Sequence, residues 1–346
     1  MGKSVLLGAL LVAGMAMGVS AAETLDEVKS RGALNCGVAQ GGSSGTAVGV
    51  TGFAAPDANG IWQGFDVALC RAVAAAVLDD PMAVNFVPTD TETRFSALAA
   101  GRVDLLSRST TWTFSRDVKL KFDFAGINYY DGQGFLVPKE MGVSSVKDLS
   151  GASICLETGT TNELTLSDYF RVNNMTYKAV PVENSADAQK KYLAGACDAY
   201  TSDASSLAAT RATFRNASEH ALLPEIISKE PLGPVVRHGD DEWGDLVRWT
   251  LYALIAAEEY GITSANIKEM AEGTDNPEIN RILGTEGELG QLLGLDNAWA
   301  VRAIKVNGNY GEIFAKNIGE ETPIGLARGL NAQWKDGGLL YAPPFR

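Results

Sequence analysis

Short apolar runs alternate with amphipathic segments along most of the chain, and this alternation limits the possible folds more than any other feature. Short apolar runs are typical of strands buried in a sheet, and a 3.6-residue apolar period is typical of helices packed against one. The pattern predicts strands at 33–38, 84–87, 103–107, 152–156, 177–182 and 198–201, and helices at 65–78, 92–100, 162–171 and 187–193. We therefore expect an α/β fold.

One junction between a helix and a strand occurs twice in the sequence. A predicted helix ends at Gly101 and Asp104 opens the next strand, and the same spacing separates Gly195 from Asp198. A glycine just after a helix adopts the left-handed conformation at little cost. Two ordinary α/β units with the same helix cap would produce this repeat. Two similar lobes, each presenting the ends of its strands to a shared crevice, would produce it as well.

The first residues have the form of a secretory signal peptide. Lys3 supplies a positive charge, residues 5–19 form a short apolar core, and residues 20–22 are small enough for cleavage. A membrane anchor is the alternative, but the apolar run is shorter than the roughly 20 residues that span a bilayer, and glycines interrupt it. We expect cleavage of residues 1–22 and export of the mature chain.

The length of the mature chain favours two domains, because single cores usually stop growing at about 250–300 residues. Segments marked by glycine and proline at 132–138 and 231–236 would carry the chain out of one lobe and back. The expected division is 23–137 plus 233–346 for the first lobe and 138–232 for the second. A long helix is expected at 241–260, and no pattern places the tail from residue 262 to 346.

Four cysteines in an exported chain favour disulfide bonds. Cys36 belongs to a predicted strand and Cys70 to the helix that follows, whereas Cys155 and Cys197 belong to two predicted strands in the middle of the chain. We therefore pair Cys36 with Cys70 and Cys155 with Cys197, one bond in each expected lobe. Four buried thiols are the alternative.

Composition and missing motifs exclude several classes of function. A formal net charge of −13 disfavours partners such as nucleic acid or an anionic membrane. The sequence contains no nucleophile elbow, phosphate loop, dinucleotide fingerprint or zinc-ligand spacing. His220 and His238 lie in polar surroundings, so both are expected on the surface. We predict no catalytic residue, no metal and no cofactor.

Three polar segments are candidates for a ligand site. The segment 107–117 places hydroxyl residues at 107, 109, 110, 111 and 113 around two arginines, of which Arg116 offers a guanidinium fork for a carboxylate. Thr160 and Thr161 open a predicted helix whose backbone N–H groups would face an anion. Asp203 follows the strand at 198–201 and offers a carboxylate. Helix capping and solvated surface charge are the alternatives for each segment. Together they match the two charges of an amino-acid zwitterion.

These segments resemble the periplasmic polar amino-acid-binding proteins of ABC transporters, bacterial extracellular solute-binding family 3. The resemblance rests on 104–116, on Gly159-Thr160-Thr161 and on Asp198-x-x-x-x-Asp203. Segments 124–134, 227–234 and 309–314 are similar to the subgroup that binds L-amino acids in general. The likeness covers nearly the whole mature chain.

The resemblance implies a two-lobed "Venus flytrap" fold, in which each lobe is a mixed sheet flanked by helices and the chain crosses the hinge twice. It also implies that Arg116 clamps the ligand α-carboxylate and that Asp203 holds the ligand ammonium. The positions that would hydrogen-bond or stack on the ligand are Ser109, Thr111, Thr161, Phe53 and Trp62. The implied partners are a free L-amino acid of broad or polar specificity and an inner-membrane permease with its ATPase, and a monomer is expected.

Two other functions share this scaffold. Exported enzymes similar to cyclohexadienyl dehydratases would need an acid near the crevice, for which Glu157 or Glu230 would serve. A sensory ectodomain is the third possibility, and the absence of a predicted membrane segment near residue 346 disfavours it.

Overall fold

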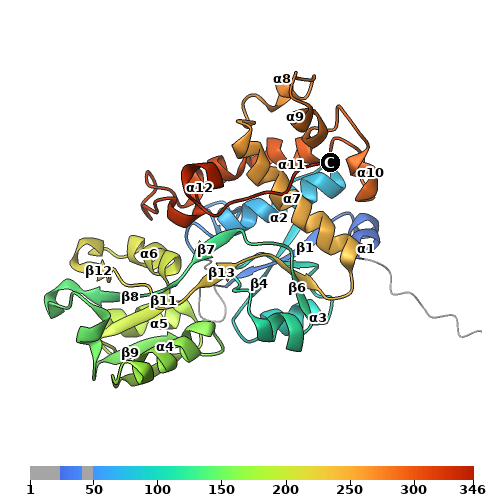
Figure 1. Cartoon of the computed structure of the whole chain (residues 1–346). Coiled ribbons are helices and arrows are strands. Elements are labelled where there is room, and N and C mark those ends of the chain that lie inside the picture. The colour runs from blue at the N-terminus through green and yellow to red at the C-terminus, as the bar shows by residue number, and fades with distance from the viewer. Residues whose placement is uncertain (1–23, 41–49) are drawn as a thin grey trace, which may run out of the picture.

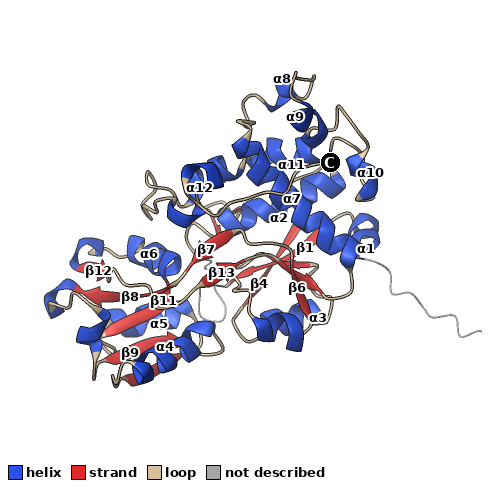
Figure 2. Ribbon diagram, viewed as in Figure 1, coloured by secondary structure: helices blue, strands red, loops and turns tan. Residues whose placement is uncertain are grey.

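The chain forms two lobes, each built on its own five-stranded sheet (Figures 1 and 2). The computed structural model describes residues 24–40 and 50–346, so the expected signal peptide lies outside the described residues. Within those two ranges, no helix combines the length and apolar character needed to cross a bilayer. The expectation of a two-lobed α/β fold is confirmed.

The sheet of the first lobe has the strand order β4-β1-β5-β14-β6. Strand β1 runs parallel to β4 and β5, and β14 runs antiparallel to β5 and β6. The strands are β1 (Leu34–Ala39), β4 (Val84–Thr89), β5 (Leu105–Leu106), β6 (Phe122–Phe124) and β14 (Val235–Arg237); the helices on this sheet include α1 (Thr24–Arg31), α2 (Phe65–Leu78), α3 (Arg94–Ala99) and α7 (Asp241–Glu259). A short hairpin, β2 (Ala55–Pro56) and β3 (Trp62–Gln63), precedes α2.

The sheet of the second lobe repeats this arrangement in the order β10-β9-β11-β8-β12. Strand β9 runs parallel to β10 and β11, and β8 runs antiparallel to β11 and β12. The strands are β8 (Gln133–Pro138), β9 (Ser153–Glu157), β10 (Lys178–Val182), β11 (Ala199–Asp203) and β12 (His220–Leu222); the helices are α4 (Thr161–Val172), α5 (Ser185–Leu193) and α6 (Ala204–Ala212).

The repeated junction seen in the sequence has the same structure in both lobes. Gly101 and Gly195 both have positive φ angles, 68° and 70°. The carboxylate of Asp104 accepts a hydrogen bond from the backbone N–H of Asn35 at 2.7 Å. Asp198 accepts the equivalent bond from the N–H of Ser153, also at 2.7 Å. Each aspartate thus links the start of one strand to the start of the parallel strand beside it, which favours the interpretation of two similar lobes.

Two antiparallel strands connect the lobes, β7 (Tyr129–Asp131) and β13 (Glu230–Leu232) (Figure 1). Just beyond β13, a Cβ atom on Gly233 would lie 2.0 Å from the carbonyl oxygen of Gly126, so only glycine permits this close approach of the two crossing segments. The expected boundary at residues 137 and 138 needs correction. Strand β8 pairs with β11 and β12 in the second sheet, so residues 133–137 belong to the second lobe and the crossing precedes them.

The C-terminal tail, which no sequence pattern placed, packs on the first lobe. Its helices are α8 (Ile267–Met270), α9 (Pro277–Ile282), α10 (Leu289–Leu292), α11 (Trp299–Asn307) and α12 (Tyr310–Asn317). Helix α11 packs against α2 and α7, and Trp299, Phe314 and Phe345 join the main apolar core. Arg328 forms a bidentate ion pair with Glu258 of α7 at 2.7 and 3.0 Å. The tail therefore extends the first lobe and adds no third core.

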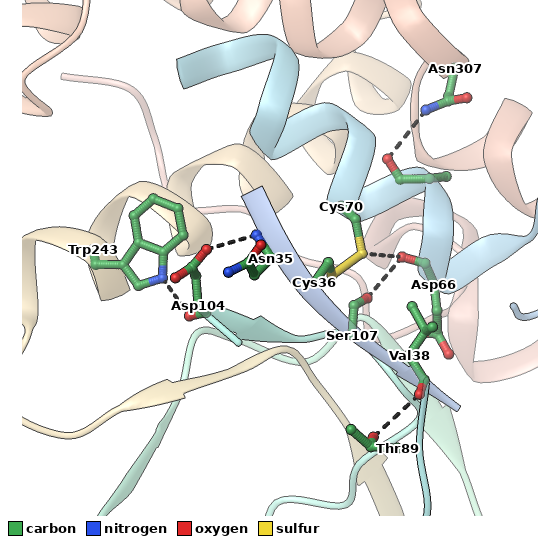
Figure 3. The surroundings of a disulfide bond; sticks show 11 residues. Asn35, Cys36, Val38, Asp66, Cys70, Thr89, Asp104, Ser107, Trp243 and Asn307 are labelled. Carbon is green, nitrogen blue, oxygen red and sulfur yellow. Dashed lines mark hydrogen bonds between the residues drawn. A yellow bond between two sulfur atoms is a disulfide. The ribbon is translucent and has the colours of Figure 1, made fainter. Parts of the chain in front are cut away.

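Both expected disulfide bonds are present. Cys36 of β1 is joined to Cys70 of α2 (Figure 3), and Cys155 of β9 is joined to Cys197 just before β11. Each bond lies within one lobe, so neither restricts movement of the lobes relative to each other.

One of the two histidines is not on the surface as expected. His220 is buried, and its Nδ1 lies 2.8 Å from the hydroxyl of Tyr192, with Phe214 packed against its ring. His220 is the first residue of strand β12, which packs against α6. The hydrogen bond to Tyr192 of α5 satisfies one ring nitrogen, so the aromatic ring can be buried. His238 is half exposed and lies 3.2 Å from Asp123.

Candidate functional site

A cavity of about 230 Å³ lies between the lobes and is lined by residues from both. The first lobe contributes residues that follow the strands β1, β4 and β5, and the second lobe contributes residues that follow β9 and β11. The six polar candidates from the sequence all line this cavity: Ser109, Thr111, Arg116, Thr160, Thr161 and Asp203. The ends of parallel strands are where ligands of open α/β sheets bind.

The two aromatic candidates do not line the cavity. Phe53 is 1% exposed and packs edge-on against Phe65 and Tyr129 in the core of the first lobe. Trp62 stacks on Phe86 of β4, with ring centroids 5.6 Å apart. Neither ring is part of the cavity lining, so the assignment of Phe53 and Trp62 as stacking residues is corrected.

Arg116 is buried on a short π-helical turn, Ser115–Lys119. Its Nη1 donates to the carbonyl of Thr111 at 2.7 Å, and its Cζ lies 5.4 Å from the ring centroid of Phe95. Burial lowers the pKa of Arg116 to about 10, and the neighbouring charge of Arg108 acts in the same direction. The group therefore stays cationic at neutral pH, with part of its fork directed at the cavity.

Asp203 ends strand β11 and makes no capping bond to helix α6, which removes the structural alternative for this residue. Its Oδ1 accepts a hydrogen bond from Asn162 Nδ2 at 3.1 Å. Burial raises the pKa of Asp203 well above its ordinary value, and the charges of Asp131 and Glu230 raise it further. A cation placed beside Asp203 would stabilise the ionised form of this carboxyl group.

Glu230 on the crossing strand β13 links the two walls of the cavity. It is 1% exposed, and its Oε2 accepts hydrogen bonds from Thr111 of the first lobe at 2.6 Å and from Thr161 of the second at 2.8 Å. Ser228 donates to its other oxygen at 2.7 Å. Glu230 thus orients two hydroxyls that face the cavity from opposite sides.

The hydroxyl of Ser109 is positioned by a hydrogen bond to the buried carboxylate of Asp66. The φ of 49° at Ser109 is left-handed, a conformation that few residues other than glycine adopt. Its Oγ donates to Asp66 Oδ2 at 3.1 Å, at the start of helix α2. Burial raises the pKa of Asp66 to about 7, whereas the Ser109 hydrogen bond and the charge of Arg108 act in the opposite direction.

Four charged or phenolic residues that the sequence patterns did not assign to ligand binding also line the cavity: Arg94, Arg108, Glu157 and Tyr200. Arg94 is the first residue of α3, and the sequence pattern there indicates only a charged residue on a solvated helix face. Arg108 belongs to the hydroxyl-rich segment 107–117, so the sequence indicated its location near the site but not that its side chain is buried. Among the described residues, no cluster of histidine, cysteine, aspartate and glutamate is arranged to hold a metal ion.

Comparison with known proteins places the chain among its relatives. The model of the bacterial extracellular solute-binding proteins, family 3, matches residues 44–266. The glutamate/glutamine/aspartate/asparagine-binding protein BztA of Rhodobacter capsulatus is 61% identical over 346 residues, 100% of both chains. The general L-amino acid-binding periplasmic protein AapJ of Rhizobium johnstonii is 53% identical over 350 residues, also 100% of both.

A solved structure is also similar to this chain over most of its length. The periplasmic binding protein of an ABC transporter from Brucella ovis, with glutathione bound, is 53% identical, with a TM-score of 0.90. The similarity covers 94% of this chain and 100% of that one. The overall two-lobed fold is thus shared with a solved relative, and the chain belongs to the bacterial extracellular solute-binding proteins of family 3.

Proposed function

We propose that the protein binds a free L-α-amino acid between its lobes in the periplasm and delivers it to an inner-membrane ABC permease with its ATPase. One observation carries the proposal: Arg116 of the first lobe and Asp203 of the second line the same cavity. A guanidinium fork suits the α-carboxylate, and a buried carboxylate suits the ammonium. The names of the relatives as amino-acid-binding proteins support this ligand class.

Closure of the lobes follows from the position of these charges. A zwitterion that pairs with both groups interacts more strongly with the closed arrangement than with the open one, and only this difference in affinity shifts the equilibrium. The strands β7 and β13 act as the hinge in this proposal, and Ser109, Thr111, Thr160 and Thr161 complete the site. The permease recognises the closed monomer, after residues 1–22 have been removed as a signal peptide.

The catalytic alternative is not part of the proposal. Relatives of 46–61% identity over 99–100% of this chain are named as binding proteins. Glu157 and Glu230, the two residues that would serve as an acid, instead have roles in ligand recognition and in orienting hydroxyls.

Calorimetric titration of the mature protein with the common L-amino acids tests the proposal. Arg116→Ala and Asp203→Asn each remove one partner of a buried charge interaction, which costs about 2–5 kcal/mol. Affinity for every amino acid that binds should therefore fall by about 30-fold or more. Arg171→Ala and Asp168→Asn, which break an exposed ion pair on α4, are matched controls and should bind normally. Unchanged affinity in the two cavity variants would remove these residues from the site.

A further inference from the structure

Two arginines in the cavity have donors that no group of the described residues uses. Arg94 is 4% exposed and Arg108 is 7% exposed. In the part of the chain that the structure describes, the Nε atoms of both residues and Nη1 of Arg108 have no hydrogen-bond partner. Buried guanidinium groups are normally paired. Because Arg116 already offers a fork for one carboxylate, these extra donors are available for a second acceptor on the ligand.

A carboxylate of the opposite lobe faces these arginines. Glu157 ends strand β9, lines the same cavity and accepts a hydrogen bond from the hydroxyl of Tyr200 at 3.0 Å. Burial raises the pKa of Glu157, whereas the Tyr200 hydrogen bond and the charges of Arg108 and Arg94 lower it. Asp203, at the end of the neighbouring strand β11, is the other charged group close to Glu157.

We propose that Arg94, Arg108 and Glu157 form a second subsite, which binds a carboxylate or a carboxamide at the end of the ligand's side chain. The inference rests on the proposed function and names the class of amino acid that the site prefers. A carboxamide satisfies both walls at once, since its oxygen accepts from the arginines and its NH₂ group donates to Glu157. Its binding at this subsite leaves Glu157 ionised.

A side-chain carboxylate requires one additional change in the same subsite. Its oxygens accept from Arg94 and Arg108, but the ionised Glu157 would repel it. Glu157 therefore takes up a proton from the solvent and donates it in a hydrogen bond to the ligand. One subsite thus accepts both an acid and its amide, and binding of the acid is linked to the uptake of a proton.

Titration calorimetry on the unmodified protein tests the proton linkage without any substitution. L-glutamate and L-glutamine are titrated at pH 7 and pH 8 in two buffers with different ionisation enthalpies, which gives the number of protons taken up. Both ligands carry the same ammonium and α-carboxylate, so contributions from Asp203 and Asp131 cancel in the difference. Glutamate should take up more protons than glutamine, approaching about one proton as Glu157 becomes ionised. Equal proton counts at both pH values would overturn the role of Glu157.

Arg108→Met tests the subsite itself, with L-norvaline as a ligand that lacks the polar end group. Unmodified protein should bind glutamate and glutamine at least about tenfold more tightly than norvaline. The variant should lose most of this preference, whereas Arg102→Met on the exposed surface should change neither the preference nor the norvaline affinity. If Arg108→Met weakened norvaline as much as glutamate, Arg108 would bind the α-carboxylate and the second subsite would be refuted. If no amino acid bound the unmodified protein, the proposed function itself would fail.

Discussion

Thr91 offers a direct way to measure the free energy of lobe closure. It follows β4 in the first lobe, and its Oγ1 donates to the carbonyl of Thr158, which follows β9 in the second lobe, at 3.3 Å. This hydrogen bond joins the lobes without passing through the hinge, so it exists only when the cavity is closed. Thr91→Val removes the hydroxyl and nearly preserves the shape of the side chain.

The expected magnitude follows from the neutral character of this bond. A hydrogen bond between uncharged groups contributes about 1 kcal/mol, and 1.4 kcal/mol corresponds to a factor of ten in affinity. If the liganded protein is closed and the free protein is open, the whole loss appears in the binding equilibrium. The dissociation constant should therefore rise about fivefold, and by the same factor for each amino acid.

Calorimetry and stopped-flow fluorescence provide the measurements. The increase should appear mainly in the dissociation rate, because the bond forms after the ligand has entered. Thr176→Val, at an exposed threonine of the second lobe, is the control and should bind as the unmodified protein does. Unchanged affinity for all ligands would refute the reasoning. A loss confined to one ligand would refute it too, since it would mean that Thr91 contacts that ligand directly.

Two further predictions concern residues whose environment the structure corrected. Phe53→Leu should lower the free energy of unfolding by about 1–2 kcal/mol in urea titrations and leave ligand affinity unchanged; weaker binding of every amino acid would instead return Phe53 to the site. Burial lowers the pKa of His220, against the opposing charges of Glu219 and Glu140, so the folded state favours the neutral ring. Stability should therefore fall as the pH drops below about 6.5, where the unfolded chain binds the proton first, and His220→Gln should show less of this loss; equal pH profiles in chemical denaturation would contradict it.

Much of the fold could be predicted from local patterns. The helix expected at 65–78 has those limits in the structure, and the strand expected at 33–38 occupies Leu34–Ala39. The apolar pattern succeeds here because most residues of both elements are buried, and their apolar runs record that burial directly. The pairing of Cys36 with Cys70 could be inferred for a related reason, since a strand and the helix that follows it pack together in an α/β unit.

The site was only partly predictable from the same patterns. Arg116 and Asp203 belong to polar segments at strand ends, where side chains of open α/β sheets converge, so their types and positions were informative. Arg94 begins an ordinary amphipathic helix, and no local signal distinguishes a charge that faces solvent from one that faces the opposite lobe. Phe53 was misassigned for the converse reason, because an aromatic residue near a glycine-rich segment fits a core or a pocket equally well.

The sequence by itself determined the elements, the repeated junction at Asp104 and Asp198, and the charges available to a ligand. Only the tertiary structure decided which of those charges meet, that Glu230 joins Thr111 to Thr161, and that the tail completes the first lobe. The physical reason is the range of the interactions. Periodicity and capping act over a few residues, whereas the cavity is formed by residues from two lobes that the chain brings together across the hinge.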